Sequence, residues 1–199
     1  MKKLYISESA GFCFGVRRAV RLCEQAAEKK ERCVTLGPII HNSSVTAKLA
    51  RMGVREAGDV SQVSHGDTVI IRSHGAGKPE LEALAKTGAQ VLDATCPDVA
   101  KIHRIVRTEA EAGRTVVIIG ERTHPEITAI SSWCGGCAVL ETPWELSCWL
   151  DENPEKKCAP ISVVFQTTNT REVFEACCEE LKKECTNYKI FDTICNATS

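Results

Sequence analysis

Short apolar runs alternate with amphipathic segments along the whole 199-residue chain, and this alternation limits the possible folds more than any other feature. In one such segment Val99, Ile102 and Val106 recur at helical spacing. The pattern predicts an α/β fold with mostly parallel sheets and flanking helices. We expect strands at 4–6, 33–36, 68–71, 90–92, 115–119, 138–140, 162–165 and 189–191. We expect helices at 16–29, 43–51, 79–87, 99–112, 125–132, 143–150 and 170–183.

An internal repeat divides this pattern into two similar halves. CVTLGPIIHN (33–42) resembles TVVIIGERTHPE (115–126), and VIIRSHGAG (69–77) corresponds to VVFQTTN (163–169). VLDATC (91–96) then matches IFDTIC (190–195), so the order of elements is preserved. We therefore expect two homologous α/β lobes, a first lobe at 14–96 and a second lobe at 97–192. Residues 1–13 and 193–199 lie outside both.

Composition excludes several classes of function. The net charge is −1 and only 5% of residues are aromatic, which favours neither nucleic-acid binding nor attraction to an anionic membrane. No apolar run is long enough for a membrane span, and the first residues do not form a signal peptide. We expect a cytoplasmic protein, where thiols stay reduced. The twelve cysteines therefore do not indicate a disulfide scaffold.

Three of those cysteines share one setting. Cys13, Cys96 and Cys195 each follow a strand-like run and stand in a short turn, and Cys96 and Cys195 both lie three residues after an aspartate. The carboxyl ends of parallel strands meet at one edge of a sheet, so the three thiols are expected to meet there. Three thiolates leave a metal centre one protein ligand short of four, as in a reactive site. An iron–sulfur cluster, a zinc ion and three unrelated buried thiols all remain open at this stage.

Polar side chains also follow the expected strands. His41, His74 and His124 can each donate a hydrogen bond to a phosphate oxygen, although any one alone is more typical of a loop. Glu126 falls in the first turn of a helix, where it either complements the helix dipole or relays a proton. Gln166 and Thr167 end a strand, where they either bind a ligand or form a turn.

One further motif has no partner. Cys134 and Cys137 form a CxxC, which resembles a redox or metal motif. Because no second CxxC accompanies it, we assign it no role at this stage.

Seven ordered motifs together resemble a known family. GFCFGVRRAV, LGPIIHN, IRSHGAG, DATCP, THPEI, QTTNT and TICNAT are similar, in order and spacing, to the 4-hydroxy-3-methylbut-2-enyl diphosphate reductase family of isoprenoid biosynthesis. The resemblance implies a [4Fe-4S] cluster held by Cys13, Cys96 and Cys195, with one iron not ligated by protein. It implies a two-electron reductive dehydroxylation that gives isopentenyl and dimethylallyl diphosphates, with electrons from a ferredoxin or flavodoxin.

The resemblance also implies roles for the polar residues. His41, His74 and His124 match residues that bind the diphosphate or line the pocket, and Glu126 matches the residue that delivers a proton. Thr167, beside Gln166, best matches a threonine that contacts the substrate.

The family pattern continues beyond the last motif found here. Its members have a third lobe that closes a three-lobed arrangement around the cluster and supplies serine and asparagine ligands for the diphosphate. We expect 1–13 to contribute to that lobe, 193–199 to begin it, and the rest of it to be missing from this chain. The alternative to an enzyme is a non-catalytic module that holds a cluster or metal and senses redox state, or an inactive fragment of the enzyme.

Overall fold

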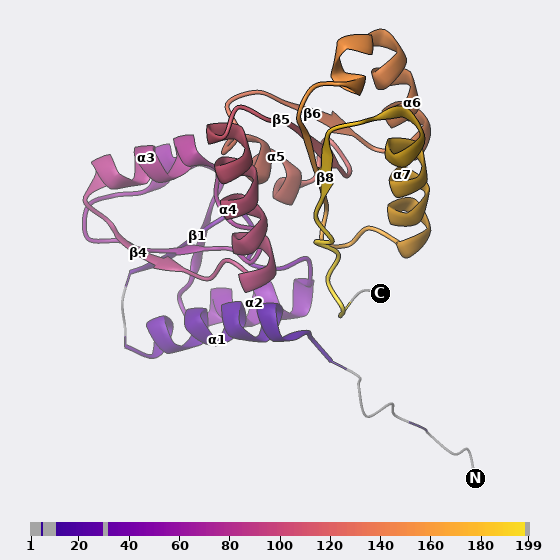
Figure 1. Ribbon diagram of the computed structural model, residues 1–199. Helices are drawn as coiled ribbons and strands as arrows, with labels where there is room; N and C mark the ends of the chain where they lie inside the picture. The colour runs from indigo at the N-terminus through magenta and orange to yellow at the C-terminus, as the bar shows by residue number, and fades with distance from the viewer. Residues whose placement is uncertain (1–4, 6–10, 30–31, 198–199) are drawn as a thin grey trace.

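The computed structural model describes residues 5, 11–29 and 32–197. The strand expected at 4–6, apart from Tyr5, and most of the 1–13 segment lie outside the described residues. Two four-stranded sheets with flanking helices form the described part of the chain, one built from indigo to magenta residues and the other from red to yellow ones (Figure 1). Every strand pairing in both sheets is parallel, which confirms the α/β fold expected from the alternating pattern.

The first sheet has the strand order β2-β1-β3-β4. Its elements in chain order are α1 (Phe14–Glu28), β1 (Cys33–Leu36), α2 (Ser43–Arg51), β2 (Arg55–Ala57), the 3-10 helix η1 (Val60–Gln62), β3 (Thr68–Ile71), α3 (Lys78–Thr87) and β4 (Gln90–Asp93).

The second sheet repeats this arrangement, with the order β6-β5-β7-β8. Its elements are α4 (Pro97–Glu111), β5 (Thr115–Ile119), α5 (Pro125–Ser131), β6 (Cys137–Leu140), α6 (Pro143–Glu152), the 3-10 helix η2 (Pro154–Lys157), β7 (Ile161–Phe165), α7 (Arg171–Glu184) and β8 (Tyr188–Ile190). The strand orders correspond one to one, which supports the predicted duplication. We propose that the chain divides between the two lobes at Cys96, as the repeat predicts.

Alternation along the central strands places helices on both faces of each sheet. In β3, Ile70 packs with α1 and α2 in one cluster, whereas Val69 and Ile71 pack with Leu84 of α3 on the other face. A strand buried on both faces needs apolar residues at successive positions, and the run TVII supplies them.

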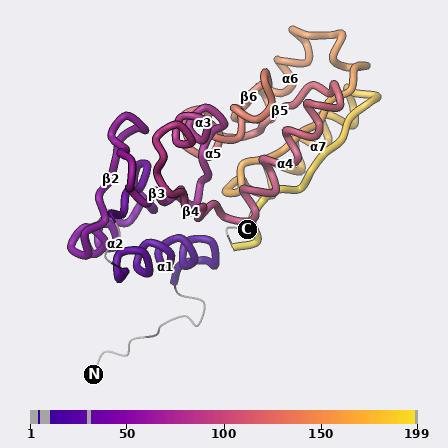
Figure 2. The backbone as a smooth tube through the Cα atoms, turned by 90° about the vertical axis from the view of Figure 1, so that its left-hand side faces the viewer, coloured from indigo at the N-terminus to yellow at the C-terminus, as the bar shows by residue number. Residues whose placement is uncertain are grey.

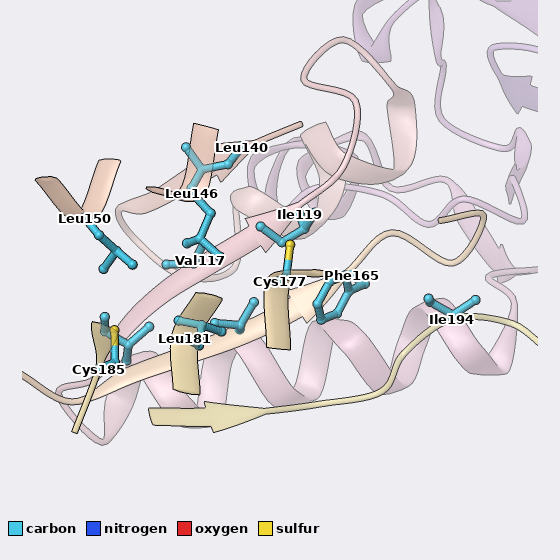
Figure 3. Packing of buried hydrophobic residues seen from close by; sticks show 12 residues of the cluster. Val117, Ile119, Leu140, Leu146, Leu150, Phe165, Cys177, Leu181, Cys185 and Ile194 are labelled. Carbon is cyan, nitrogen blue, oxygen red and sulfur yellow. The ribbon is translucent and has the colours of Figure 1, made fainter. Parts of the chain in front are cut away.

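Helices also cover both faces of the second sheet, so each lobe has three layers. Figure 3 shows side chains of α6 and α7, among them Leu146 and Leu181, packed against Val117 and Phe165 of the strands. On the opposite face α4 and α5 contribute a separate cluster that includes Ile102. Full burial of each such side chain stabilises the fold by about 1.5–3 kcal/mol.

The two lobes meet near the carboxyl ends of their strands. Figures 1 and 2 both show the C-terminal end of the described chain beside the N-terminal ends of α1 and α4. Three segments far apart in sequence therefore come together at one place. None of the described helices is long and apolar enough to cross a membrane.

Candidate metal centre and adjoining pocket

Two helix N-termini position two of the three cysteines. Cys13 is the N-cap of α1 and Cys96 is the N-cap of α4. Both cysteines therefore lie at the positive end of a helix dipole. Burial raises the pKa of Cys96, whereas hydrogen bonds from the backbone amides of Asp98 and Val99 act in the opposite direction. These amides would stabilise an anionic sulfur.

The third cysteine repeats the setting of the second. The amide of Cys96 donates to the carbonyl of Ser73 at 2.9 Å, and the amide of Cys195 donates to the carbonyl of Thr167 at 2.8 Å. Each cysteine thus extends the pairing of its last strand with the neighbouring strand, at equivalent positions of the two lobes. Burial raises the pKa of Cys195, and its thiol lies 3.3 Å from an oxygen of Asp98. Asp98 therefore joins the two cysteine turns.

All three cysteines line the same two adjoining cavities. One cavity, of about 550 Å³, is bordered by Cys13, Cys96 and Cys195 together with charged residues that include Lys101. The other, of about 190 Å³, is bordered by the same cysteines and by residues of both lobes. Among the described residues no three His, Cys, Asp or Glu side chains are close enough to hold a single metal ion. The three thiols thus border a shared space without converging on one point.

The smaller cavity contains most of the predicted polar residues. His74, His124, Glu126 and Thr167 line it. His41 lies beside them, because its ring centroid is 5.5 Å from that of His74, which is in turn 5.3 Å from that of His124. The structure therefore brings the three predicted histidines close together.

The surroundings of two of these histidines determine the hydrogen bonds that they can make. Burial, followed by the neighbouring His124, lowers the pKa of His74 to about 4, so its imidazole is neutral at pH 7. Its Nδ1 is buried and has no hydrogen-bond partner within the part of the chain that is described. His124 is the N-cap of α5, and its Nδ1 accepts from the amide of Glu126 at 3.1 Å. A neutral His124 must therefore carry its proton on Nε2, where it can be donated to a ligand.

Glu126 and Thr167 form a buried pair. The carboxylate of Glu126 accepts from the amide and from the hydroxyl of Thr167, both at 2.7 Å. The side chains belong to α5 and to the segment after β7, so two elements of the second lobe hold this pair in place. Both residues are less than a tenth exposed, and the pair borders the cavity that the cysteines share.

Comparison with known proteins identifies the family of this chain. Residues 4–199 match the LytB protein family. The chain belongs to the LytB family. A relative from Thermoanaerobacter sp. (strain X514), named 4-hydroxy-3-methylbut-2-enyl diphosphate reductase, is 38% identical over 98% of this chain and 68% of its own length. A relative of the same name from Aquifex aeolicus (strain VF5) is 38% identical over all of this chain and 68% of its own length.

Two solved structures resemble this chain in both sequence and fold. A structure described as (E)-4-hydroxy-3-methyl-but-2-enyl diphosphate reductase, the terminal enzyme of the non-mevalonate pathway, is 38% identical and has a TM-score of 0.84. The aligned region covers 98% of this chain and 68% of the chain in that structure. The E-1-hydroxy-2-methyl-but-2-enyl-4-diphosphate reductase from Plasmodium falciparum is 27% identical with a TM-score of 0.86, over 94% of this chain and 59% of its own. The family expected from the seven motifs is thus confirmed.

One predicted site residue of this LytB chain, Gln166, has a structural contact of its own. The side-chain oxygen of Gln166 accepts from the amide of Glu121 at 2.9 Å and so secures the loop after β5. An added Cβ at Gly120 would come within 2.8 Å of Gln166, which explains the glycine. Gln166 is not among the residues that line the two cavities. Its predicted contact with substrate stays a prediction.

The sequence alone did not indicate two residues of the site, Gly15 and Asp98. An added Cβ at Gly15 would lie 2.7 Å from the sulfur of Cys96, so only glycine permits this approach of α1 to the second cysteine. Asp98, which contacts Cys195, follows the motif DATCP directly. Its role depends on a contact across 97 residues, which local sequence does not reveal.

The donor set fits an iron–sulfur cluster. Three thiols border one space, backbone amides donate to the sulfur of Cys96, and a glycine leaves room beside that sulfur. Thiolates are the usual ligands of such clusters, and hydrogen bonds to sulfur tune them.

Proposed function

We propose that this chain acts as a 4-hydroxy-3-methylbut-2-enyl diphosphate reductase, in which Cys13, Cys96 and Cys195 hold a [4Fe-4S] cluster with one iron not ligated by protein. The observation that carries the proposal is the shared cavity, where the three thiols face His74, His124, Glu126 and Thr167. When bound, the cluster would supply electrons and a Lewis-acidic iron for removal of an allylic hydroxyl.

The histidines provide the means of holding a diphosphate. His124 offers a donor at Nε2 because its Nδ1 is already occupied by the amide of Glu126. His74 is neutral and can donate one hydrogen bond without adding charge to the cavity. With His41 beside it, this row of imidazoles suits the several acceptor oxygens of a phosphate group.

The Glu126–Thr167 pair provides a path for a proton. The hydroxyl of Thr167 donates to an oxygen of Glu126, and both residues line the cavity. A proton held at the carboxyl of Glu126 can pass through this hydroxyl to a leaving oxygen, which makes departure as water possible. In this proposal the reaction consumes two electrons and two protons and gives isopentenyl and dimethylallyl diphosphates.

Electrons would come from a ferredoxin or flavodoxin. Lys101 borders the larger cavity, and the exposed Arg17 lies on α1 close behind Cys13. Asp98 and Asp192 balance Lys101 and Arg171 in the lining of this cavity, so the net positive charge that favours docking of a small acidic redox protein comes from Arg17. Raising the salt concentration should then weaken electron delivery from the protein donor and leave delivery from an uncharged dye unchanged.

Anaerobic reconstitution of the 199-residue chain tests the proposal. Iron, inorganic sulfide and the visible spectrum are measured first, followed by turnover of the hydroxylated diphosphate with a reduced dye. We expect cluster formation and formation of both products. A chain that holds one zinc ion and no sulfide would contradict the cluster. A chain that holds the cluster but neither binds nor converts the diphosphate would favour the redox-sensing module.

A further inference from the structure

A second pair of thiols lies apart from the cavities described above. Cys134 follows the end of α5 and Cys137 begins β6, with two glycines between them. Both sulfurs contact the carbonyl of Ser131, at 3.1 Å from Cys134 and 3.9 Å from Cys137. The thiols therefore share one acceptor and lie on the same side of the turn.

The turn itself permits the sulfurs to approach each other. Gly135 and Gly136 have φ values of +62° and +139°, which L side chains rarely adopt, and an added Cβ at either would meet nothing within 4 Å. Both glycines are exposed, Cys137 is half-buried and Cys134 is buried beneath them. A backbone of this kind has the conformational freedom that a sulfur–sulfur bond of about 2.05 Å requires.

The surroundings favour a thiolate at Cys134. This residue borders an open cavity of about 490 Å³ with Lys78 of α3 and with Arg107 and Glu111 of α4. Lys78 and Arg107 against Glu111 give the lining of this cavity one net positive charge. A hydrogen bond with Cys137 lowers the pKa of Cys134, whereas it raises the pKa of Cys137. Such an asymmetry gives a pair one attacking and one resolving thiol.

Other cysteines lack this combination. Burial raises the pKa of Cys23 and of Cys177 to about 12, which makes them poor nucleophiles. Among the described cysteines with a shifted pKa, Cys134 alone has it lowered. Reaction with a mild oxidant should therefore select this pair.

We propose that Cys134 and Cys137 form a reversible dithiol–disulfide site that reacts with low-molecular-weight disulfides such as oxidised glutathione. The thiolate of Cys134 attacks one sulfur of the small disulfide and expels one thiolate. Cys137, having lost its proton to solvent, then attacks the mixed disulfide at Cys134 and expels the second thiolate. The pair loses two electrons and two protons, and the small disulfide is reduced to two thiols.

The residues next to this pair contact the loop that contains His74. The hydroxyl of Ser132 accepts from the amide of Lys78 at 2.9 Å, and the indole of Trp133 donates to the carbonyl of Ala76 at 3.3 Å. These two contacts hold the 75–78 segment, and they come from the residues directly before Cys134. Closing the disulfide contracts the turn and loosens this attachment.

Peptide mapping tests the disulfide. The chain, purified without oxygen, is incubated with oxidised glutathione under anoxic conditions, alkylated and digested. We expect the peptide with Cys134 and Cys137 to lose two hydrogens, and dithiothreitol to restore them. In Cys137→Ser the reaction should stop at a mixed disulfide on Cys134, whereas Cys158→Ser, a change at an exposed thiol, should behave as the unchanged chain. Glutathione attached to Cys158 while Cys134 and Cys137 stay reduced would overturn the proposal.

Two kinetic measurements test the chemistry and the consequence. Lys78→Met should slow alkylation of Cys134 at pH 7 by about threefold or more, because one of the two cations that line the cavity at Cys134 is removed. Hydrogen exchange at the amides of 74–78 should become about tenfold faster in the oxidised chain and stay unchanged in Cys137→Ser treated in the same way. Equal exchange in both redox states of the unchanged chain would overturn the link to His74.

Discussion

Replacement of Gly15 by alanine places a methyl group directly against a proposed cluster ligand. The added Cβ would lie 2.7 Å from the sulfur of Cys96, about 0.7 Å inside the 3.4 Å at which ordinary contact begins. Because Gly15 lies within α1 without a positive φ, the alanine has no backbone strain and gains about 1 kcal/mol of helix propensity. Overpacking costs about 1–3 kcal/mol, so the net loss of stability should be about 2 kcal/mol or less.

The effect on the metal centre should be much larger than the effect on stability. Ligand positions at metal sites tolerate about 0.2 Å, whereas the sulfur of Cys96 must move by several times that distance. We expect iron affinity to fall at least 10- to 100-fold, the range found when ligand positioning is disturbed. The assay is anaerobic reconstitution at limiting iron, with thermal unfolding of the metal-free chain measured in parallel.

Gly58→Ala is the matched control, because its added Cβ meets nothing closer than 3.9 Å and its φ is not positive. It should retain full iron uptake. Full iron uptake and normal turnover by Gly15→Ala would refute the assignment of Cys96 as a ligand at this contact.

Three further changes test other parts of the structure. Glu126→Gln should leave the cluster spectrum intact and lower turnover about 100-fold or more, since it removes a proton donor; near-normal turnover would exclude Glu126 from the mechanism. Burial raises the pKa of Glu109, but hydrogen bonds from Ser162 and Lys189 outweigh it and the net shift is downward. Glu109→Gln should therefore lower the free energy of unfolding by about 1–3 kcal/mol at pH 7. This loss should become smaller below the unfolded pKa of about 4.3, where Glu109 becomes protonated. If denaturant titrations gave the same loss at pH 7 and at pH 3, the lowered pKa would be contradicted. Asn42→Ala removes the cap that accepts from Val45 at 3.1 Å and should cost about 1 kcal/mol by denaturant unfolding, and an unchanged midpoint would show that the cap contributes nothing.

The repeat made much of the fold predictable from the sequence. Central strands such as β5 and β7 are apolar at nearly every position, because both of their faces are covered, and their ranges were predicted to within one residue. β2 was missed, since two of its three residues, Arg55 and Glu56, are charged and exposed. It is recognisable only by its pairing with β1, through contacts such as Val34 with Arg55. Edge strands of this kind leave little trace in hydrophobic periodicity.

The site was predictable where it follows the repeat and hidden where it depends on contacts between elements. Cys96 and Cys195 occupy equivalent turns, so the repeat predicted that they would correspond. The hydrogen bonds of Thr167 to Glu126 join residues 41 positions apart, and nothing in either segment specifies them. The hydrogen bond from the amide of Glu121 to the side-chain oxygen of Gln166 joins residues 45 positions apart and was equally hidden in the sequence.

Iron and sulfide content of single cysteine variants tests the central claim most directly. The account predicts about four irons and four sulfides in the reconstituted chain. It predicts loss of most of both in Cys13→Ser, Cys96→Ser and Cys195→Ser, and full retention in Cys158→Ser. Retention of a complete cluster by any of the first three variants would contradict the claim that these three thiols hold it.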